Sequence, residues 1–246
     1  MAEKVRLDLV LFQKGLAESR EKARAMIMAG LVDVDWVRVE KPGAPVSPHS
    51  HILVKNAYPP YVSRGGLKLE AALNSFSVDV HGKVILDVGA STGGFTDCLL
   101  QRGAAKVIAV DVGYGQLHWK LRQDPRVMVV ERTNIRHLEP GALKEEIDGA
   151  VIDVSFISLK LAVPAASRHL KDHAFMITLV KPQFEVGKGR VGKGGVVRDP
   201  LLHLEVMDRM CQFFRNLGWD VAGQMPSPLL GPKGNKEFLI YLSRNR

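Results

Sequence analysis

A glycine-rich segment early in the second quarter of the chain has the spacing of a nucleoside-binding site. The segment reads DVGASTGGFTD from Asp87 to Asp97 and continues an apolar run, Val84–Val88. Glycines in a turn between a strand and a helix let the backbone approach a ligand closely. A second apolar run ends at Asp111, 22 positions after Gly89, where an acidic residue commonly binds the two hydroxyls of a ribose. The spacing therefore predicts a site for a nucleoside-containing cofactor.

Two cofactor classes use such a site, and the residues of this loop favour one of them. The glycines depart from the G-x-G-x-x-G pattern of dinucleotide sites, in which a helix N-terminus faces a pyrophosphate. A carboxylate at Asp87 would repel phosphate but suits the sulfonium and amino group of S-adenosylmethionine. We therefore expect S-adenosylmethionine, with a nicotinamide enzyme as the fold-level alternative. The expected cofactor contacts are Asp87, Gly89, Ala90, Ser91, Thr92, Gly93, Gly94, Phe95, Asp111 and Val112.

The elements that must hold this loop are buried strands alternating with helices. The predicted strands are Val84–Val88, Lys106–Val112, Val127–Glu131, Ala150–Val154, Phe175–Val180, Trp219–Gln224 and Glu237–Leu242. The predicted helices are Phe95–Gln101, Gly115–Gln123, Leu159–His169 and Leu201–Leu217. This alternation is typical of a Rossmann-like α/β fold, a doubly wound and mostly parallel sheet. Such a sheet binds its ligands at the carboxyl ends of the strands.

The first part of the chain has a different pattern, which predicts a separate small α+β domain. Helices are expected over Val5–Lys14 and Arg20–Ala29, with Ser19 capping the second. The alternating stretch Leu31–Val39 predicts a hairpin with Asp35-Trp36 at its tip. Adjacent prolines at 59 and 60 interrupt both helix and strand. We therefore predict a domain over residues 1–57, a linker over 58–63 and a second domain over 64–246.

Composition narrows the classes of partner. The chain has 34 Lys and Arg against 26 Asp and Glu, a formal charge of +8, which favours a nucleic acid or an anionic surface as partner. No apolar run approaches the roughly 20 residues of a membrane span, and the charged N-terminus lacks a signal-peptide core. The two cysteines are far apart, which argues against a disulfide framework or a cysteine metal site. We expect a cytoplasmic protein with neither a metal nor a membrane partner.

Longer motifs across the chain resemble one protein family. DVGASTGGFTD, VDVGYGQL, ERTN, DVSFISL, LVKPQFEVGKG and GPKGNKEF occur in this order. Together they resemble the TlyA (hemolysin A) family, which is similar to FtsJ-type ribose methyltransferases. Residues 6–54 resemble the alpha-L RNA-binding fold of the S4 domain. Trp36 departs from that fold, which usually has a turn glycine there, and either alters the hairpin or supplies a stacking surface.

The resemblance implies a reaction, 2′-O-methylation of cytidine ribose in ribosomal RNA, and four catalytic residues. By motif these are Lys68, Asp153, Lys181 and Glu237. The methyl group of a sulfonium is already activated, so the protein must align the attack and remove a proton from the hydroxyl. A lysine can be the base only if its pKa is lowered. We assign Lys181 as base by analogy, although the sequence does not distinguish it from Lys68; the two acids would orient the lysines.

Basic side chains outside this set are the candidates for contact with RNA. The stretch Lys181–Arg198 combines cations with glycines, which suits a segment that follows a phosphate backbone. The same function is expected for cations of the N-terminal domain. The predicted RNA-binding residues are Arg6, Arg20, Lys22, Arg24, Arg64, Lys188 and Arg190.

Three other functions are weighed against this enzyme. A non-catalytic RNA-binding or ribosome-assembly protein could dispense with the four catalytic residues, whereas this chain has all of them. A hemolysin-type cytolysin needs a membrane-seeking or barrel pattern, and the sequence has neither. A pseudouridine synthase could share the N-terminal fold, but its chemistry needs no S-adenosylmethionine. We therefore expect the partner to be ribosomal RNA or a ribosomal subunit.

Overall fold

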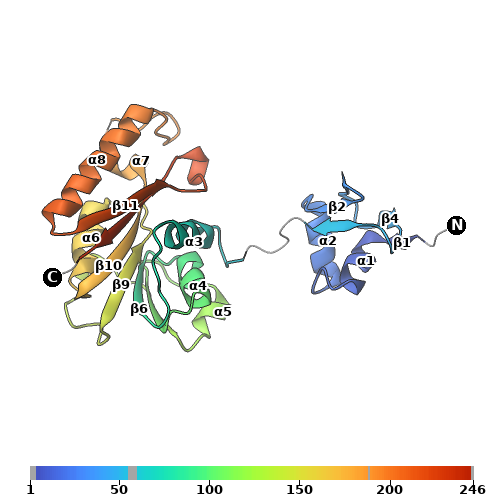
Figure 1. Cartoon of the computed structure of the whole chain (residues 1–246), viewed down its shortest axis with the longest axis horizontal. Coiled ribbons are helices and arrows are strands. Elements are labelled where there is room, and N and C mark those ends of the chain that lie inside the picture. Colours follow the sequence, from blue (N-terminus) through green and yellow to red (C-terminus); the bar gives the residue numbers. More distant parts are fainter. Residues whose placement is uncertain (1–3, 55–59, 188, 245–246) are drawn as a thin grey trace. The chain divides into compact units, whose positions relative to one another are not determined.

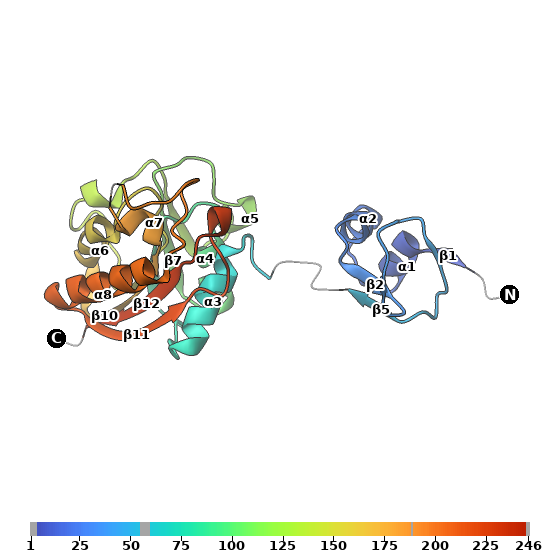
Figure 2. The same cartoon turned by 90° about the horizontal axis from the view of Figure 1, so that it is seen from above.

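The computed structural model describes residues 4–54, 60–187 and 189–244. The chain divides into two compact units, Met1–Pro59 and Pro60–Arg246 (Figures 1 and 2). Lys188, one of the predicted RNA-binding residues, lies outside the described residues. Each unit has a hydrophobic core of its own, so each is described by itself.

The N-terminal unit packs two helices against two small antiparallel sheets. The elements are β1 (Val5–Arg6), α1 (Leu7–Gln13), α2 (Arg20–Met28), β2 (Val32–Val34), β3 (Val37–Arg38), β4 (Pro45–Val46) and β5 (Ile52–Val54). Strand β2 lies between β3 and β5, and β1 pairs with β4. Leu7 and Leu11 of α1 and Ala23 and Ile27 of α2 are fully buried. Their spacing of four residues places each pair on one helix face, which forms the core.

Two predictions for this unit are confirmed and one is wrong. The Ser19 hydroxyl accepts a hydrogen bond from the Lys22 amide at 3.2 Å, so Ser19 caps α2. Asp35 and Trp36 form the tip of the β2–β3 hairpin. The helix predicted from Val5 begins only at Leu7, because Val5 and Arg6 pair as a strand with β4.

The second unit contains a seven-stranded sheet in the order β11-β12-β10-β9-β6-β7-β8. The strands are β6 (Val84–Val88), β7 (Lys106–Val110), β8 (Val127–Val130), β9 (Ile147–Ile152), β10 (Leu170–Val180), β11 (Asp220–Pro226) and β12 (Phe238–Ser243). Strands β8, β7, β6, β9 and β10 are parallel neighbours, and β12 runs antiparallel to β10 and β11. The predicted mostly parallel α/β sheet is therefore confirmed.

Helices cover both faces of this sheet (Figure 1). They are α3 (Gly65–Ser75), α4 (Gly94–Gln101), α5 (Trp119–Arg122), α6 (Leu159–Ser167), α7 (Pro182–Glu185) and α8 (Pro200–Asn216), with the 3-10 turns η1 (Ile135–His137) and η2 (Pro232–Gly234). Neighbouring strand residues point to opposite faces. Ile85 packs in the core beneath α3 and α4, whereas Leu86 packs in the core beneath α6 and α8.

The sequence does not predict helix α3, and some predicted boundaries differ from the structure. Helix α3 begins with two glycines, which are poor helix formers, and its cap Arg64 makes no side-chain capping hydrogen bond. The helix predicted over Gly115–Gln123 is confined to Trp119–Arg122. Strand β7 ends at Val110, so Asp111 and Val112 belong to the loop that follows rather than to the strand.

Candidate active site

The segment from the end of β6 to the start of α4 is so closely packed that a side chain at Gly89 or Gly94 would collide with its neighbours. Gly89 has a φ of +84°, and a Cβ there would lie 2.4 Å from the carbonyl oxygen of Asp153. A Cβ on Gly94 would lie 2.1 Å from the Ser63 hydroxyl, just before α3. The loop therefore touches the end of β9 and the start of α3, which brings three parts of the chain to one edge of the sheet.

Asp111 faces this loop from the end of β7. Its Oδ2 accepts a hydrogen bond from the Ser91 amide at 2.8 Å, and its Oδ1 accepts one from the Gly113 amide at 2.7 Å. These bonds hold the carboxylate in the wall of a cavity of about 460 Å³. The wall also includes Gly89, Ser91, Val112, Thr133, Asn134, Asp153, Phe156 and Ile157.

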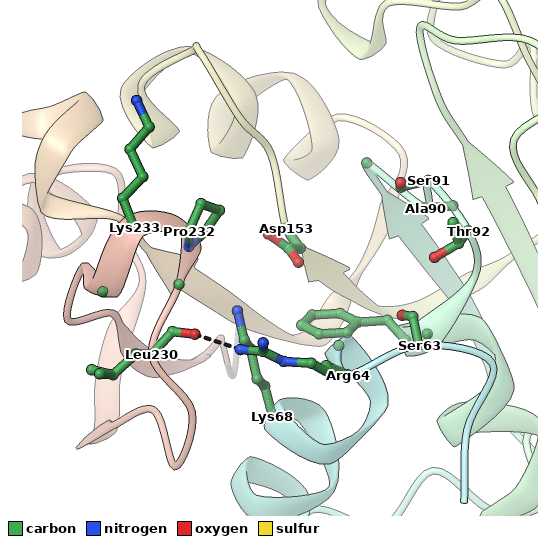
Figure 3. Close-up of a pocket in the computed structure, with 16 residues that line it drawn as sticks. Ser63, Arg64, Lys68, Ala90, Ser91, Thr92, Asp153, Leu230, Pro232 and Lys233 are labelled. Carbon is green, nitrogen blue, oxygen red and sulfur yellow. Dashed lines mark hydrogen bonds between the residues drawn. The ribbon is translucent and has the colours of Figure 1, made fainter. Parts of the chain in front are cut away.

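A second cavity, of about 550 Å³, lies between the glycine loop, α3 and η2 (Figure 3). Its wall includes Ser63, Arg64, Lys68, Ala90, Thr92, Gly94, Phe95, Leu230, Pro232 and Lys233. Gly89, Ser91 and Asp153 line both cavities. The two spaces therefore meet at the end of β9, and the Asp153 carboxylate stands at their junction.

Two residues predicted to contact the cofactor lie behind the cavity walls. Asp87 is fully buried, and its Oδ2 accepts a hydrogen bond from the Thr96 hydroxyl at 2.6 Å. Its Oδ1 has no hydrogen-bond partner among the described residues. Burial, together with the nearby carboxylates of Asp153 and Asp111, raises the pKa of Asp87 to about 7, although the hydrogen bond from Thr96 lowers it. Gly93 has a φ of +97° and lies against the Leu121 side chain. Its role is therefore to give the loop a backbone conformation that other residues rarely adopt.

The four residues that the resemblance marks as catalytic form two ion pairs at the same edge. Lys68 on α3 lies 2.5 Å from Glu237, and Lys181 lies 2.7 Å from Asp153. Both lysine side chains are about nine-tenths buried, and the Glu237 side chain is fully buried. Val180, the last residue of β10, pairs with Phe238, the first residue of β12. Lys181 follows Val180 and Glu237 precedes Phe238, so the two reach the same edge of the sheet. The structure thus assembles all four.

Contacts between the loops after β9 and β10 fix one of these pairs. The Lys181 ammonium also donates to the Ser155 hydroxyl at 2.8 Å. Glu185, in α7, accepts hydrogen bonds from the Ser158 hydroxyl at 2.6 Å and the Leu159 amide at 2.8 Å. Burial raises the pKa of Glu185. The sequence analysis did not identify Ser155 or Glu185 as site residues. The available signal was that Glu185 is a lone acid four positions after Lys181.

The predicted RNA-binding residues of the N-terminal unit include two that share an acidic partner. Arg6 and Arg20 pair with the buried Asp8 at 2.9 and 3.4 Å. The hydrogen bond from Arg6 lowers the pKa of Asp8 to about 2. Lys22 pairs with Glu18, and Arg24 is exposed on the same helix. Asp8 therefore fixes two guanidinium groups while leaving about half of each side chain exposed.

The remaining predicted RNA contacts lie in the second unit. Arg64 lines the larger cavity and donates a hydrogen bond to the Leu230 carbonyl at 2.7 Å (Figure 3). Arg190 pairs through both terminal nitrogens with Glu205 on α8. Arg64 is thus placed beside the candidate active site, whereas Arg190 is engaged by a carboxylate outside it.

Two features are absent from the part of the chain that the structure describes. Within residues 4–54, 60–187 and 189–244, no helix is both long and apolar enough to cross a membrane. The same part of the chain contains no group of three or more His, Cys, Asp or Glu side chains that could hold a metal ion.

Comparison with known families defines the class of protein. The pattern of the FtsJ-like methyltransferase family matches residues 61–244, and that of the S4 domain matches residues 5–52. The first match includes every residue of the two ion pairs and both cavities. The second unit is therefore an FtsJ-like methyltransferase domain, and the N-terminal unit contains an S4 domain.

Individual relatives sharpen this assignment. YqxC of Bacillus subtilis, provisionally named an rRNA methyltransferase, is 50% identical over 98% of this chain and 86% of its own length. The 16S/23S rRNA (cytidine-2′-O)-methyltransferase TlyA of Mycobacterium tuberculosis is 48% identical over 98% of this chain and 91% of its own. A solved structure from Streptococcus thermophilus, provisionally named a hemolysin, is 44% identical, covers 100% of this chain and 90% of that one, and superposes with a TM-score of 0.76. The chain belongs to the TlyA (hemolysin A) family of FtsJ-like methyltransferases.

Proposed function

We propose that this protein transfers a methyl group from S-adenosylmethionine to the 2′-hydroxyl of a cytidine ribose in ribosomal RNA. Family membership and the name of the M. tuberculosis relative support the reaction class and the acceptor. The observation that carries the proposal is the Asp153 carboxylate, which lines both cavities and is paired with Lys181. One cavity would hold the cofactor and the other the target nucleotide.

The cavity beside Asp111 suits the cofactor. The Asp111 carboxylate is fixed by two backbone amides, and each carboxylate oxygen can accept a further hydrogen bond. It would take the ribose hydroxyls of the cofactor. At Gly89 the backbone forms part of the wall and has no room for a Cβ, so a ligand can lie directly against it. When bound, S-adenosylmethionine supplies a methyl group already activated by the positive sulfur.

The paired lysines and acids would handle the proton of the RNA hydroxyl. Lys181, in its neutral form, would remove the proton as the hydroxyl oxygen attacks. Asp153 at 2.7 Å would then stabilise the ammonium that forms, and the Ser155 hydroxyl would hold the amine in line. Lys68 lines the larger cavity, where its ammonium would position the ribose hydroxyl. Glu237 would hold Lys68 in that orientation.

Basic residues in the larger cavity and elsewhere on the chain would bring the RNA to this site. Arg64 lines the larger cavity, where it would meet a phosphate next to the target nucleotide. In the S4 domain, Arg6, Arg20, Lys22 and Arg24 would contact the RNA backbone, and Arg190 would do so from the glycine-rich loop. The partner would be ribosomal RNA or a ribosomal subunit in the cytoplasm.

Methyl transfer to unmodified ribosomal RNA tests the proposal. The wild-type chain, given S-adenosylmethionine with a tritiated methyl group and RNA lacking its modifications, should place label on a ribose 2′-oxygen. The variant Lys181→Met should lose this activity while still binding the cofactor. Label that persists in Lys181→Met but disappears in Lys68→Met would transfer the role of base to Lys68. Cofactor binding by the wild type without label on RNA from either subunit would refute the proposed acceptor.

A further inference from the structure

The tip of the S4-domain hairpin has a backbone conformation that its residues do not favour. Asp35 and Trp36 connect β2 to β3 and have φ values of +48° and +69°. Two-residue hairpin turns of this kind require a positive φ at both positions, and Asn-Gly or Asp-Gly is the preferred pair. Aspartate tolerates this region, but for a bulky side chain such as tryptophan it is strained. Trp36 thus occupies a position where glycine would fit better.

The indole of Trp36 contributes nothing to the core of its domain. The side chain is 77% exposed, and the buried cluster of the S4 domain is built from other residues. Instead, the ring stacks on the His51 imidazole, with centroids 4.8 Å apart and planes inclined by 19°. Strain without a gain in packing is typical of positions kept for a binding function.

The stacked rings are fixed in place by the backbone. The Asp35 amide donates to the His51 carbonyl at 2.8 Å, and the His51 amide donates to the Asp35 carboxylate at 2.9 Å. The register of β2 with β5 holds the same two segments together. The indole of Trp36, stacked on His51 by one face, therefore presents its other face as a prearranged flat surface; we call the stacked pair the Trp36–His51 platform. A prearranged surface loses little conformational entropy when a ligand binds.

A cation lies next to this platform. The ammonium of Lys14, just after α1, donates a hydrogen bond to the Ser50 carbonyl at 3.2 Å, one residue from His51. The Lys14 side chain remains exposed. An exposed aromatic face with a neighbouring cation matches a nucleotide, in which a flat base is joined to a phosphate.

We propose that the Trp36–His51 platform binds an unpaired base of the RNA by stacking, with Lys14 beside the adjoining phosphate. This inference rests on the proposed function insofar as it takes the partner to be RNA. Stacking uses the π-face that every base has, so the platform accepts any unpaired base. A base within a duplex is covered on both faces by its neighbours, so the platform favours single-stranded segments, loops and bulges.

Binding of RNA to variants of the full-length protein tests the platform. The probes are a fluorescein-labelled single-stranded oligouridylate and an RNA duplex of the same length, followed by fluorescence anisotropy. Trp36→Gly should weaken binding of the single strand by about 5- to 150-fold, as expected for the loss of one stacked base. Trp36→Phe, which keeps an aromatic ring, should stay within about twofold of the wild type. Binding of the duplex should change in neither variant.

Salt dependence and stability separate stacking from other causes. Arg24→Gln should reduce the slope of log affinity against log salt by about one, whereas Trp36→Gly should leave the slope unchanged. Trp36→Gly should also unfold at the same temperature as the wild type or higher, because glycine relieves the strained turn. Unchanged binding of the single strand by folded Trp36→Gly would overturn the platform, as would an equal loss of duplex binding.

The proposed function and the platform can fail independently. If the wild type methylates ribosomal RNA but Trp36→Gly binds single strands normally, the reaction stands and the platform is refuted. If the wild type transfers no methyl group to any ribosomal RNA but Trp36→Gly loses single-strand binding, the platform stands and the proposed reaction is refuted.

Discussion

The two halves of the sheet edge hold their carboxylates in different ways. At the ends of β6 and β7, Asp87 is bonded to a threonine hydroxyl and Asp111 to two backbone amides. At the ends of β9, β10 and β12, Asp153 and Glu237 are paired with lysines instead. The two arrangements lie side by side in the sheet, since β6 and β9 are adjacent strands.

This difference matches two kinds of chemistry. Neutral donors orient a carboxylate without cancelling its charge, so Asp111 offers the cavity of the β6–β7 half a carboxylate that suits a cationic cofactor. A buried lysine–acid pair is neutral overall, and removing one partner leaves an uncompensated buried charge. With the lysine in its neutral form, such a pair can take up a proton, and the carboxylate then stabilises the ammonium that forms. The predictions below test whether the two halves are functionally separate in this way.

The largest effect is expected at Lys181. Lys181→Met should lower kcat by about 10²- to 10⁴-fold, the usual contribution of a general base, while the Kd for S-adenosylmethionine stays within about twofold. Lys181→Arg should be nearly as inactive, because a guanidinium is not deprotonated in proteins. Single-turnover methyl transfer and calorimetric titration of the cofactor measure the two quantities. An active Lys181→Arg variant would show that the position supplies charge rather than a base.

At Asp111, in the β6–β7 half of the sheet edge, we expect a loss of cofactor affinity rather than of kcat. Asp111→Asn should weaken cofactor binding by about 10- to 100-fold, as for the loss of hydrogen bonds to a charged acceptor. The kcat at saturating cofactor should change little, because Asp111 is bonded to backbone amides and not to either of the paired lysines. Calorimetry and saturation kinetics on the same preparation would check this. A fall in kcat with unchanged cofactor affinity would contradict the division between the halves.

The buried Asp87 should make the methyltransferase unit less stable as the pH rises. Burial raises its pKa to about 7 in the folded protein, against about 4 in the unfolded chain. The folded state therefore favours the protonated acid, so the contribution of Asp87 to stability is fully present below pH 4 and is lost as the pH rises through 7. Asp87→Asn should remove this decrease and raise the free energy of unfolding at pH 8 by about 2–4 kcal/mol.

Asp8 in the S4 domain provides the matched control of opposite sign. Its pKa is lowered to about 2 by the hydrogen bond from Arg6, so its stabilising contribution is present above pH 4 and is lost as the pH falls through 2. Asp8→Asn should flatten the acid side of the curve and leave the interval from pH 4 to 7 unchanged. Denaturant titrations across pH would show both slopes; a pH-independent wild type between 4 and 7 would contradict the assignment for Asp87.

The same two halves differ in how much of them the sequence predicts. The cofactor loop is local: its glycines need backbone conformations that few other residues adopt, and Asp111 follows at a characteristic spacing. The lysine pairs are not local. Lys68 and Glu237 lie 169 positions apart, and α3, which carries Lys68, has no helix-start signal. Only the resemblance to a family indicated that Lys68 and Glu237 belong to one site.

Ion-pair partners were the least predictable contacts in both units. Charge and spacing identified Arg6, Arg20 and Arg190 as cations available to RNA, but the structure gives each an acidic partner. The partner of Arg190 lies 15 positions away on α8, where only the fold can bring it. The cluster of Glu185, Ser158 and Ser155 was missed for the same reason.

The smallest effect is expected where a cation–acid pair is exposed rather than buried. Arg190 and Glu205 are both solvent-accessible, and exposed pairs contribute little because water and salt screen them. Glu205→Gln should therefore leave the unfolding temperature unchanged while freeing Arg190 for phosphate. RNA affinity should rise by about twofold, and the salt slope should steepen by up to about one. Filter binding at several salt concentrations measures both. A weaker affinity of Glu205→Gln for RNA would instead mean that Glu205 holds Arg190 in its RNA-binding position. The exposed pair would then act like the buried pairs, in which an acid holds a lysine in place.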